Sequence, residues 1–179
     1  MTTFKDNLTE YLAKYEDDIN DNKWDNVFEP YRTLTDQTPK FACRKLNQFL
    51  IDNEVFIDKY LTIIPQYAYR DVRMNGHIFD FSNIIMIDNS AFYNHNELVK
   101  IDLSNVEYIG DFAFWACEKL TEVHLKKVQF IGDQAFGNCG DGITPVTIYY
   151  HGTKEQWDTQ VTKNRYWHRW TDVKIKFVK

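Results

Sequence analysis

Three residues that could bind a metal recur at a constant spacing. His95, Cys117 and Cys139 follow one another at intervals of 22 residues. In a fold whose adjacent strands are about 5 Å apart, their side chains would lie one above another. A zinc site would need a fourth ligand and deprotonated thiols, and the sequence has no Cys-x-x-Cys pair. We therefore predict a buried, unreactive thiol ladder, with no metal and no cofactor.

An acid and an imidazole also fall at neighbouring repeat positions, Asp102 and His124. Such a pair could orient a catalytic base, but no nucleophile accompanies it, and polar surfaces of sheets often carry such pairs. The chain contains no G-x-S-x-G, no phosphate-binding glycine loop and no H-E-x-x-H. We predict no catalytic residues and no enzyme activity.

Basic and aromatic residues alternate near the C-terminus. Such a segment could stack bases and neutralise phosphates, or form the centre of a protein interface. We favour a third interpretation, a C-terminal cap in which Trp157 and the two tryptophans of this segment cover the end of the fold. A closing strand, in which Val173, Ile175 and Phe177 alternate, is expected to follow. The residues of this candidate site are Arg165, Tyr166, Trp167, Arg169 and Trp170.

A 22-residue repeat must position all of these side chains. Segments 79–84, 101–106 and 123–128 align without a gap, and each leads to an isoleucine and then to an Ala-Phe pair. This periodicity predicts a solenoid. A degenerate repeat lies before residue 79, because Leu61, Ile64, Ala68 and Tyr69 precede Ile84, Ile87, Ala91 and Phe92 by 23 residues each. At the other end, Val146 and Ile148 follow Val123 and Leu125 by 23. Gly110 and Gly132 are expected in tight turns with positive φ.

Alternation within each repeat predicts short parallel strands whose polar residues form an outward ladder face. The expected columns are Asp80/Asp102/His124/Thr147, Ile78/Lys100/Glu122/Pro145 and Ser82/Ser104/Lys126/Tyr149. Solenoids commonly bind partners on this kind of face; the alternative is a merely solvated sheet surface. The candidate partner-binding residues are Asp80, Ser82, Lys100, Asp102, Ser104, Glu122, His124, Lys126, Thr147 and Tyr149.

The fold class that we predict is an α+β repeat: a short solenoid with a parallel strand ladder. Apolar residues at helical spacing in the first 60 residues predict an α-helical N-terminal cap. The expected division is residues 1–60 for this cap, 61–150 for about three full repeats with partial ends, and 151–179 for a Trp-rich C-terminal cap. Acidic residues at positions 16–29 could mimic nucleic acid, although a charged helix face is usually only solvated.

Charge and composition narrow the classes of function. The net charge of −5 argues against general binding to phosphates, although from residue 151 onward seven Lys and Arg oppose three acids, which gives this part +4 and the remainder −9. Three widely spaced cysteines fit a reducing compartment. No 18-residue apolar run and no signal peptide are recognisable. We expect a cytoplasmic protein that does not bind membranes.

The pattern L-x-x-I-x-L-x-x-V-x-x-I-G-x-x-A-F-x-x-C runs from Leu98 to Cys117 and recurs from Leu120 to Cys139. It resembles the BspA-like class of leucine-rich repeats, over roughly residues 61–158. Many members of that class are surface or secreted proteins that bind host molecules. Short forms without a leader, to which this chain is similar, look like proteins encoded by bacteriophages and prophages. The resemblance implies a leucine-rich-repeat solenoid.

The function that we predict is a non-catalytic protein-interaction module with an unidentified protein partner, such as a host factor that a phage protein inhibits. Nucleic-acid binding through the basic aromatic segment and self-assembly as a structural component are the alternatives. The oligomeric state does not follow from the sequence.

Overall fold

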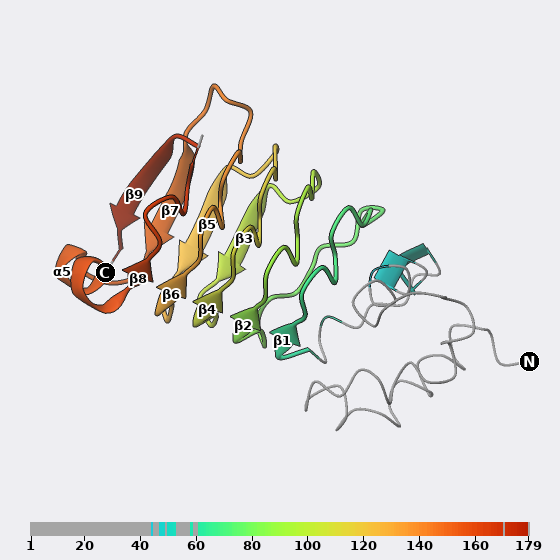
Figure 1. Ribbon diagram of the computed structural model, residues 1–179, viewed down its shortest axis with the longest axis horizontal. Coiled ribbons are helices and arrows are strands. Elements are labelled where there is room, and N and C mark those ends of the chain that lie inside the picture. The colour runs from blue at the N-terminus through green and yellow to red at the C-terminus, as the bar shows by residue number, and fades with distance from the viewer. Residues whose placement is uncertain are drawn as a thin grey trace, which may run out of the picture.

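Two parallel ladders of short strands, stacked turn upon turn, make up the body of the protein (Figure 1). The structure is a computed structural model that describes residues 44, 47, 48, 50–52, 58, 61–169 and 171–178. The predicted solenoid with a parallel strand ladder is confirmed. Most of the predicted N-terminal helical cap lies outside the described residues and stays a prediction, as does the division of the chain into three segments.

The first ladder contains β3 (Lys100–Leu103), β5 (Glu122–Leu125), β7 (Val146–Tyr150) and β9 (Val173–Phe177), in that order. Buried and outward residues alternate along β3, β5 and β7, as expected for strands with one face on the core. Every pairing is parallel. β9 closes the ladder, which confirms the strand expected from the alternation of Val173, Ile175 and Phe177.

The second ladder contains β1 (Ile63–Ile64), β2 (Met86–Ile87), β4 (Tyr108–Ile109), β6 (Phe130–Ile131) and β8 (Thr162–Lys163). The second residue of each of the first four strands is a fully buried isoleucine. Ile64 pairs with Ile87, so the degenerate repeat before residue 79 forms a real turn of the solenoid with the expected offset of 23.

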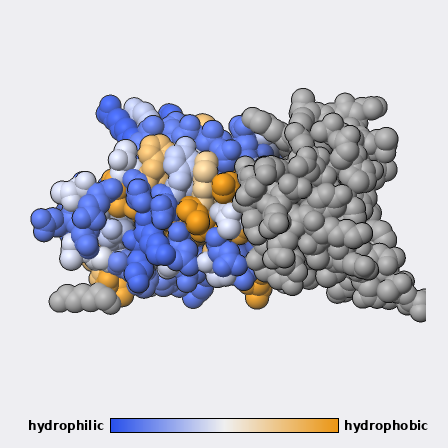
Figure 2. Space-filling model, turned by 90° about the horizontal axis from the view of Figure 1, so that it is seen from below, coloured by the Kyte–Doolittle hydropathy of each residue, from blue (hydrophilic) through white to orange (hydrophobic). Residues whose placement is uncertain are grey.

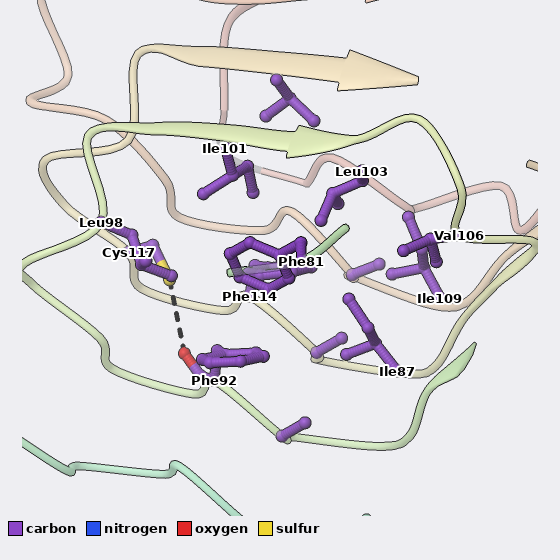
Figure 3. Packing of buried hydrophobic residues seen from close by; sticks show 14 of the residues in the cluster. Phe81, Ile87, Phe92, Leu98, Ile101, Leu103, Val106, Ile109, Phe114 and Cys117 are labelled. Carbon is purple, nitrogen blue, oxygen red and sulfur yellow. Dashed lines mark hydrogen bonds between the residues drawn. The ribbon is translucent and has the colours of Figure 1, made fainter. Parts of the chain in front are cut away.

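A column of parallel aromatic rings fills the space between the ladders (Figure 3). Phe92 and Phe114 stack at a centroid distance of 5.4 Å, and Phe114 and Phe136 stack at 5.3 Å. Tyr69 extends the column at 5.2 Å from Phe92. All three phenylalanines are completely buried. Because each ring stacks on the ring of the neighbouring turn, it loses one of its stacking contacts if that turn is removed. This is the physical reason that several repeats are needed together.

Three expectations from the sequence are wrong in detail. Phe79–Phe81 keeps the buried alternation but is not a strand, so Asp80 and Ser82 lie beside the first ladder rather than in it. β7 pairs with β5 at an offset of 25 residues, since Val123 is opposite Ile148; the loop after Cys139 therefore holds three extra residues, not one. Gly110 and Gly132 do not have positive φ.

The bends between the ladders place ordinary residues in left-handed backbone conformations. One such position in successive turns holds Asp71, Asn94, Ala116 and Asn138, with φ between 53° and 57°. Asp and Asn tolerate this region because their side chains bond locally, whereas alanine has no such compensation. Ala116 is therefore the one strained member of this column.

We expect Ala116→Gly to raise the free energy of unfolding by about 1 kcal/mol, because glycine adopts positive φ without a steric penalty. Ala113→Gly is the matched control: Ala113 is fully buried and does not have positive φ, so the same change there should lower stability by about 1 kcal/mol. Chemical denaturation of both variants measures the difference. Equal effects of the two substitutions would contradict the strain at Ala116.

The C-terminal end of the solenoid is covered by tryptophans from two segments. α5 (Lys154–Gln160) begins with a capping box formed by Thr153 and Gln156. It buries Trp157, whose ring contacts Trp167 edge-on at 6.0 Å. Trp167 in turn packs on Phe136, the last ring of the core column, at 6.1 Å. These two residues thus cover the last turn, as the cap interpretation predicted; Trp170 lies outside the described residues.

Candidate functional site

The outward face of the first ladder gathers polar side chains from four strands. Its observed columns are Lys100/Glu122/Thr147/Lys174 and Asp102/His124/Tyr149/Lys176. Thr147 and Tyr149 therefore each stand one column away from the predicted position, because of the 25-residue offset. The same offset places His151, which follows β7, in line with Lys126 and Ser104 after β5 and β3.

A chain of hydrogen bonds crosses this face. His124 bonds Glu122 Oε1 through Nε2 at 3.1 Å and His151 Nε2 through Nδ1 at 3.0 Å. Lys100 Nζ lies 3.4 Å from the other oxygen of Glu122. Hydrogen bonding from His124, helped by Lys100, holds the pKa of Glu122 below its usual value. Glu122 is thus an ionised acid whose charge is already balanced by its neighbours.

Flat side chains continue the face toward the C-terminal end. The rings of His124 and Tyr149 stack at 4.8 Å with an interplanar angle of 7°. Lys176 Nζ lies 5.0 Å from the centre of the Tyr149 ring and donates to its hydroxyl at 3.3 Å. A flat, partly exposed platform with cations at its margin is well suited to hold a partner without ordering flexible side chains.

The two aspartates at one end of the face, Asp80 and Asp102, accept hydrogen bonds from serines of their own turns. Asp102 accepts hydrogen bonds from the N–H and the hydroxyl of Ser104, and Asp80 accepts one from the N–H of Ser82. Burial would raise the pKa of Asp102, but the Ser104 bonds and the nearby imidazoles outweigh it, so the pKa is lowered. The pKa of Asp80 is lowered chiefly by the Ser82 N–H. The repeat pattern alone had assigned Ser82 and Ser104 to the ladder face, whereas in the structure both serines close turns.

Analysis of the sequence missed three residues of this face: His151, Lys174 and Lys176. The alternation of Val173, Ile175 and Phe177 already placed the two lysines on the outward side of a closing strand. His151 had no such signal, because its position depends on the length of the loop at 140–145. Only the observed register brings it against His124.

In the column of His95, Cys117 and Cys139, the two cysteines are explained by backbone carbonyls that need a donor. Cys117 Sγ donates to the carbonyl of Phe92 at 3.3 Å (Figure 3), and Cys139 Sγ donates to that of Phe114 at 3.0 Å. Burial raises the pKa of the Cys117 thiol well above its usual value, which makes it unreactive. The structure agrees with an inert thiol ladder. Among the residues that the structure describes, no three His, Cys, Asp or Glu side chains are placed to hold a metal ion.

Thr171 continues this column at the C-terminal end, although no repeat pattern indicates it. Its hydroxyl donates to the carbonyl of Phe136 at 2.7 Å and accepts from the N–H of Cys139 at 2.8 Å. The loss of both bonds in Thr171→Val would leave two buried backbone groups without this partner, so we expect the free energy of unfolding to fall by about 2 kcal/mol.

Thr171→Ser is the matched control, since it keeps the hydroxyl. Urea denaturation should rank the proteins as wild type, Thr171→Ser and Thr171→Val in order of falling stability. A valine variant as stable as the serine variant would show that the two hydrogen bonds contribute nothing.

The basic aromatic segment is divided between the cap and the surface. Trp167 is buried, whereas Tyr166 is 46% exposed. The guanidinium groups of Arg165 and Arg169 lie 5.4 Å and 5.5 Å from the centre of the Tyr166 ring. These three residues border an open pocket of about 410 Å³, which His168, Thr171 and Asp172 also line. The segment is thus partly a cap and partly a small cationic surface.

Apolar side chains are scattered over the surface. Seen from below, the described part of the molecule is mostly hydrophilic, with apolar residues in small separate groups (Figure 2). On this face, polar and aromatic clusters are therefore the first candidates for a binding surface. No helix of the described residues is long and apolar enough to cross a membrane.

The family model of the BspA type leucine rich repeat region matches residues 40–157 in six copies. This match spans about two thirds of the chain. No curated protein matches the chain, and no solved structure does.

Proposed function

Because the chain belongs to the BspA-type leucine-rich-repeat family, we propose that it is a non-catalytic protein-binding module that uses the outward face of its first ladder. Repeats of this family generally mediate contacts between proteins and are typically not catalytic. The observation that carries the proposal is the cluster of Glu122, His124, Tyr149 and His151, in which stacked rings and mutual hydrogen bonds fix the side chains before a partner arrives.

Rigidity gives this face its mechanism. The strands beneath it are anchored by inward residues that are completely buried, such as Val123, Leu125 and Ile148. A surface that is ordered in advance loses little conformational entropy on association. The resemblance to short phage-encoded proteins supports a finer proposal: the protein acts inside a bacterial cell, on a factor of the host.

Affinity capture from a bacterial lysate tests the proposal. The bait is wild-type protein, beside a variant in which Asp102, His124, Lys126 and Tyr149 are all changed to alanine. A variant with Glu118→Ala and Lys119→Ala is the control, because both residues are exposed and lie outside the first ladder. We expect one protein to be retained by wild type and the control and lost by the face variant. Equal retention by all three would move the binding site away from this face.

A second candidate is nucleic-acid binding at the cationic surface formed by Arg165, Tyr166 and Arg169. The two arginines beside an exposed ring favour it, since arginine can neutralise phosphate while the ring stacks on a base. Retardation of a single-stranded oligonucleotide that weakens steeply with salt, and that disappears in Arg165→Gln/Arg169→Gln, would support this alternative.

A further inference from the structure

The C-terminal half of the ladder face carries cations without matching acids. We call this region the basic patch; it consists of His124, Lys126, Tyr149, His151, Lys174 and Lys176. Among the described residues, no carboxylate forms an ion pair with any of its three lysines. Glu122, the acid bonded to His124, is already paired with Lys100. An acidic partner would therefore find positive charge that the protein itself has not neutralised.

The two histidines of the basic patch share one hydrogen bond. Nδ1 of His124 and Nε2 of His151 are 3.0 Å apart, so one proton lies between them. If Nε2 of His124 donates to Glu122, its Nδ1 must accept from His151, which leaves Nδ1 of His151 as an unprotonated acceptor. These two hydrogen bonds hold both rings in place.

The two acids beside the pair, Asp102 and Glu122, are both engaged already, with Ser104 and with Lys100 respectively.

We propose that the basic patch binds an acidic, extended segment of a partner protein. Lys174 and Lys176 are two residues apart on β9 and both point outward. Acidic side chains at every second position of an extended segment have the same spacing, about 7 Å. The ring of Tyr149 lies between Lys176 and His124 and gives the segment a flat surface to rest on. This inference rests on the proposed protein-binding function and names the chemistry of its partner.

The first experiment measures binding of a fluorescein-labelled short peptide that alternates Glu and Ser, with a Gln/Ser peptide of the same length as the control. We expect only the acidic peptide to bind, more weakly at high salt. Lys174→Gln/Lys176→Gln should weaken binding by about tenfold. Lys119→Gln/Lys154→Gln removes the same charge from exposed sites outside the basic patch, and should change the affinity much less.

The second experiment, circular dichroism, confirms that each variant is folded.

Three outcomes would overturn the inference. Equal binding of the acidic and Gln/Ser peptides would remove the role of charge. A loss of affinity in the Lys119→Gln/Lys154→Gln variant as large as in the Lys174→Gln/Lys176→Gln variant would remove the basic patch. Displacement of the acidic peptide from the patch by a much tighter-binding oligothymidylate would assign the patch to nucleic acid. If the lysate capture nevertheless shows a partner that depends on the ladder face, the protein-binding function stands while the acidic segment does not.

Discussion

Gly132→Ala is expected to lower the free energy of unfolding by about 3 kcal/mol or more, because neighbouring turns of the solenoid touch at this residue. A Cβ atom at Gly132 would lie 2.5 Å from Asp111 Oδ1, 2.6 Å from the backbone nitrogen of Asp111 and 2.7 Å from the carbonyl carbon of Gly110. Two of these atoms belong to the backbone and cannot rotate away. The ladders on either side would have to separate, and their buried isoleucines would lose contact.

Gly142→Ala is the control that separates this collision from the ordinary cost of losing a glycine. Gly142 has a φ of +73° but nothing within 4 Å of the position of an added Cβ. It should cost only about 1 kcal/mol, the penalty for alanine in a left-handed conformation. Chemical denaturation of the two variants checks the ranking. If Gly142→Ala were the more damaging change, backbone conformation rather than contact between turns would limit the stability of the solenoid.

The glycines also show what the repeat pattern can and cannot predict. Their recurrence at positions 110 and 132 correctly indicated that the backbone is crowded at both residues. The reason expected for it, positive φ, is wrong: the positive φ values of each turn fall on residues such as Phe112 and Ala116, which follow the glycine. A sequence records that a side chain is not tolerated, but it does not distinguish a backbone constraint from a neighbour that occupies the space.

The inward residues could be predicted because burial repeats with the chain. The buried isoleucines of β1, β2, β4 and β6 pair with one another from turn to turn, and Phe92, Phe114 and Phe136 stack in the same way. Period and identity together therefore determine the stack. The outward columns of β3 and β5 followed from the same alignment, and the structure pairs Asp102 with His124 as expected. Up to β5, therefore, the alignment was sufficient to place both faces of the first ladder.

The outward residues could be predicted from the sequence only up to the loop at 140–145, where the 22-residue period of the repeat changes. The insertion in the loop at 140–145 shifts the register of β7 by two residues relative to the expected offset, which moves Thr147 and Tyr149 by one column each and brings His151 to His124. Because outward residues alternate with inward ones, a shift of two preserves the burial pattern and leaves no hydrophobic signal of the error. Hydrogen bonds between side chains of different turns are therefore the part of the site that the sequence could not supply.

His95 should make the stability of the protein depend on pH between about 6.5 and 4. Its ring is completely buried, and neither ring nitrogen has a hydrogen-bond partner. It contacts Phe92 edge-on at a centroid distance of 5.8 Å. Burial in this apolar site lowers the pKa from 6.5 to about 4, although Glu97 acts in the opposite direction.

The folded protein therefore keeps His95 neutral at a pH where the unfolded chain has already bound a proton. Because the unfolded state binds more protons in this range, the contribution of His95 to stability is complete above pH 6.5 and is lost as the pH falls toward 4. The lowering of the His95 pKa from 6.5 to about 4 corresponds to about 3 kcal/mol of stability. Other groups also titrate below pH 5, so the change in wild type alone does not isolate this histidine.

His95→Cys is the comparison that isolates it, because it installs the residue that the next two turns carry at this position. The difference in unfolding free energy between wild type and His95→Cys, measured by urea denaturation at a series of pH values, removes every group that the two proteins share. We expect this difference to change by about 3 kcal/mol in favour of the variant between pH 7 and pH 4. Any cavity left by the smaller side chain adds a cost that does not vary with pH and so does not affect the slope. A difference that stayed constant over this range would mean that His95 takes up its proton as easily in the folded protein as in the unfolded chain, and that its buried nitrogens are solvated in a way the packing of the core does not show.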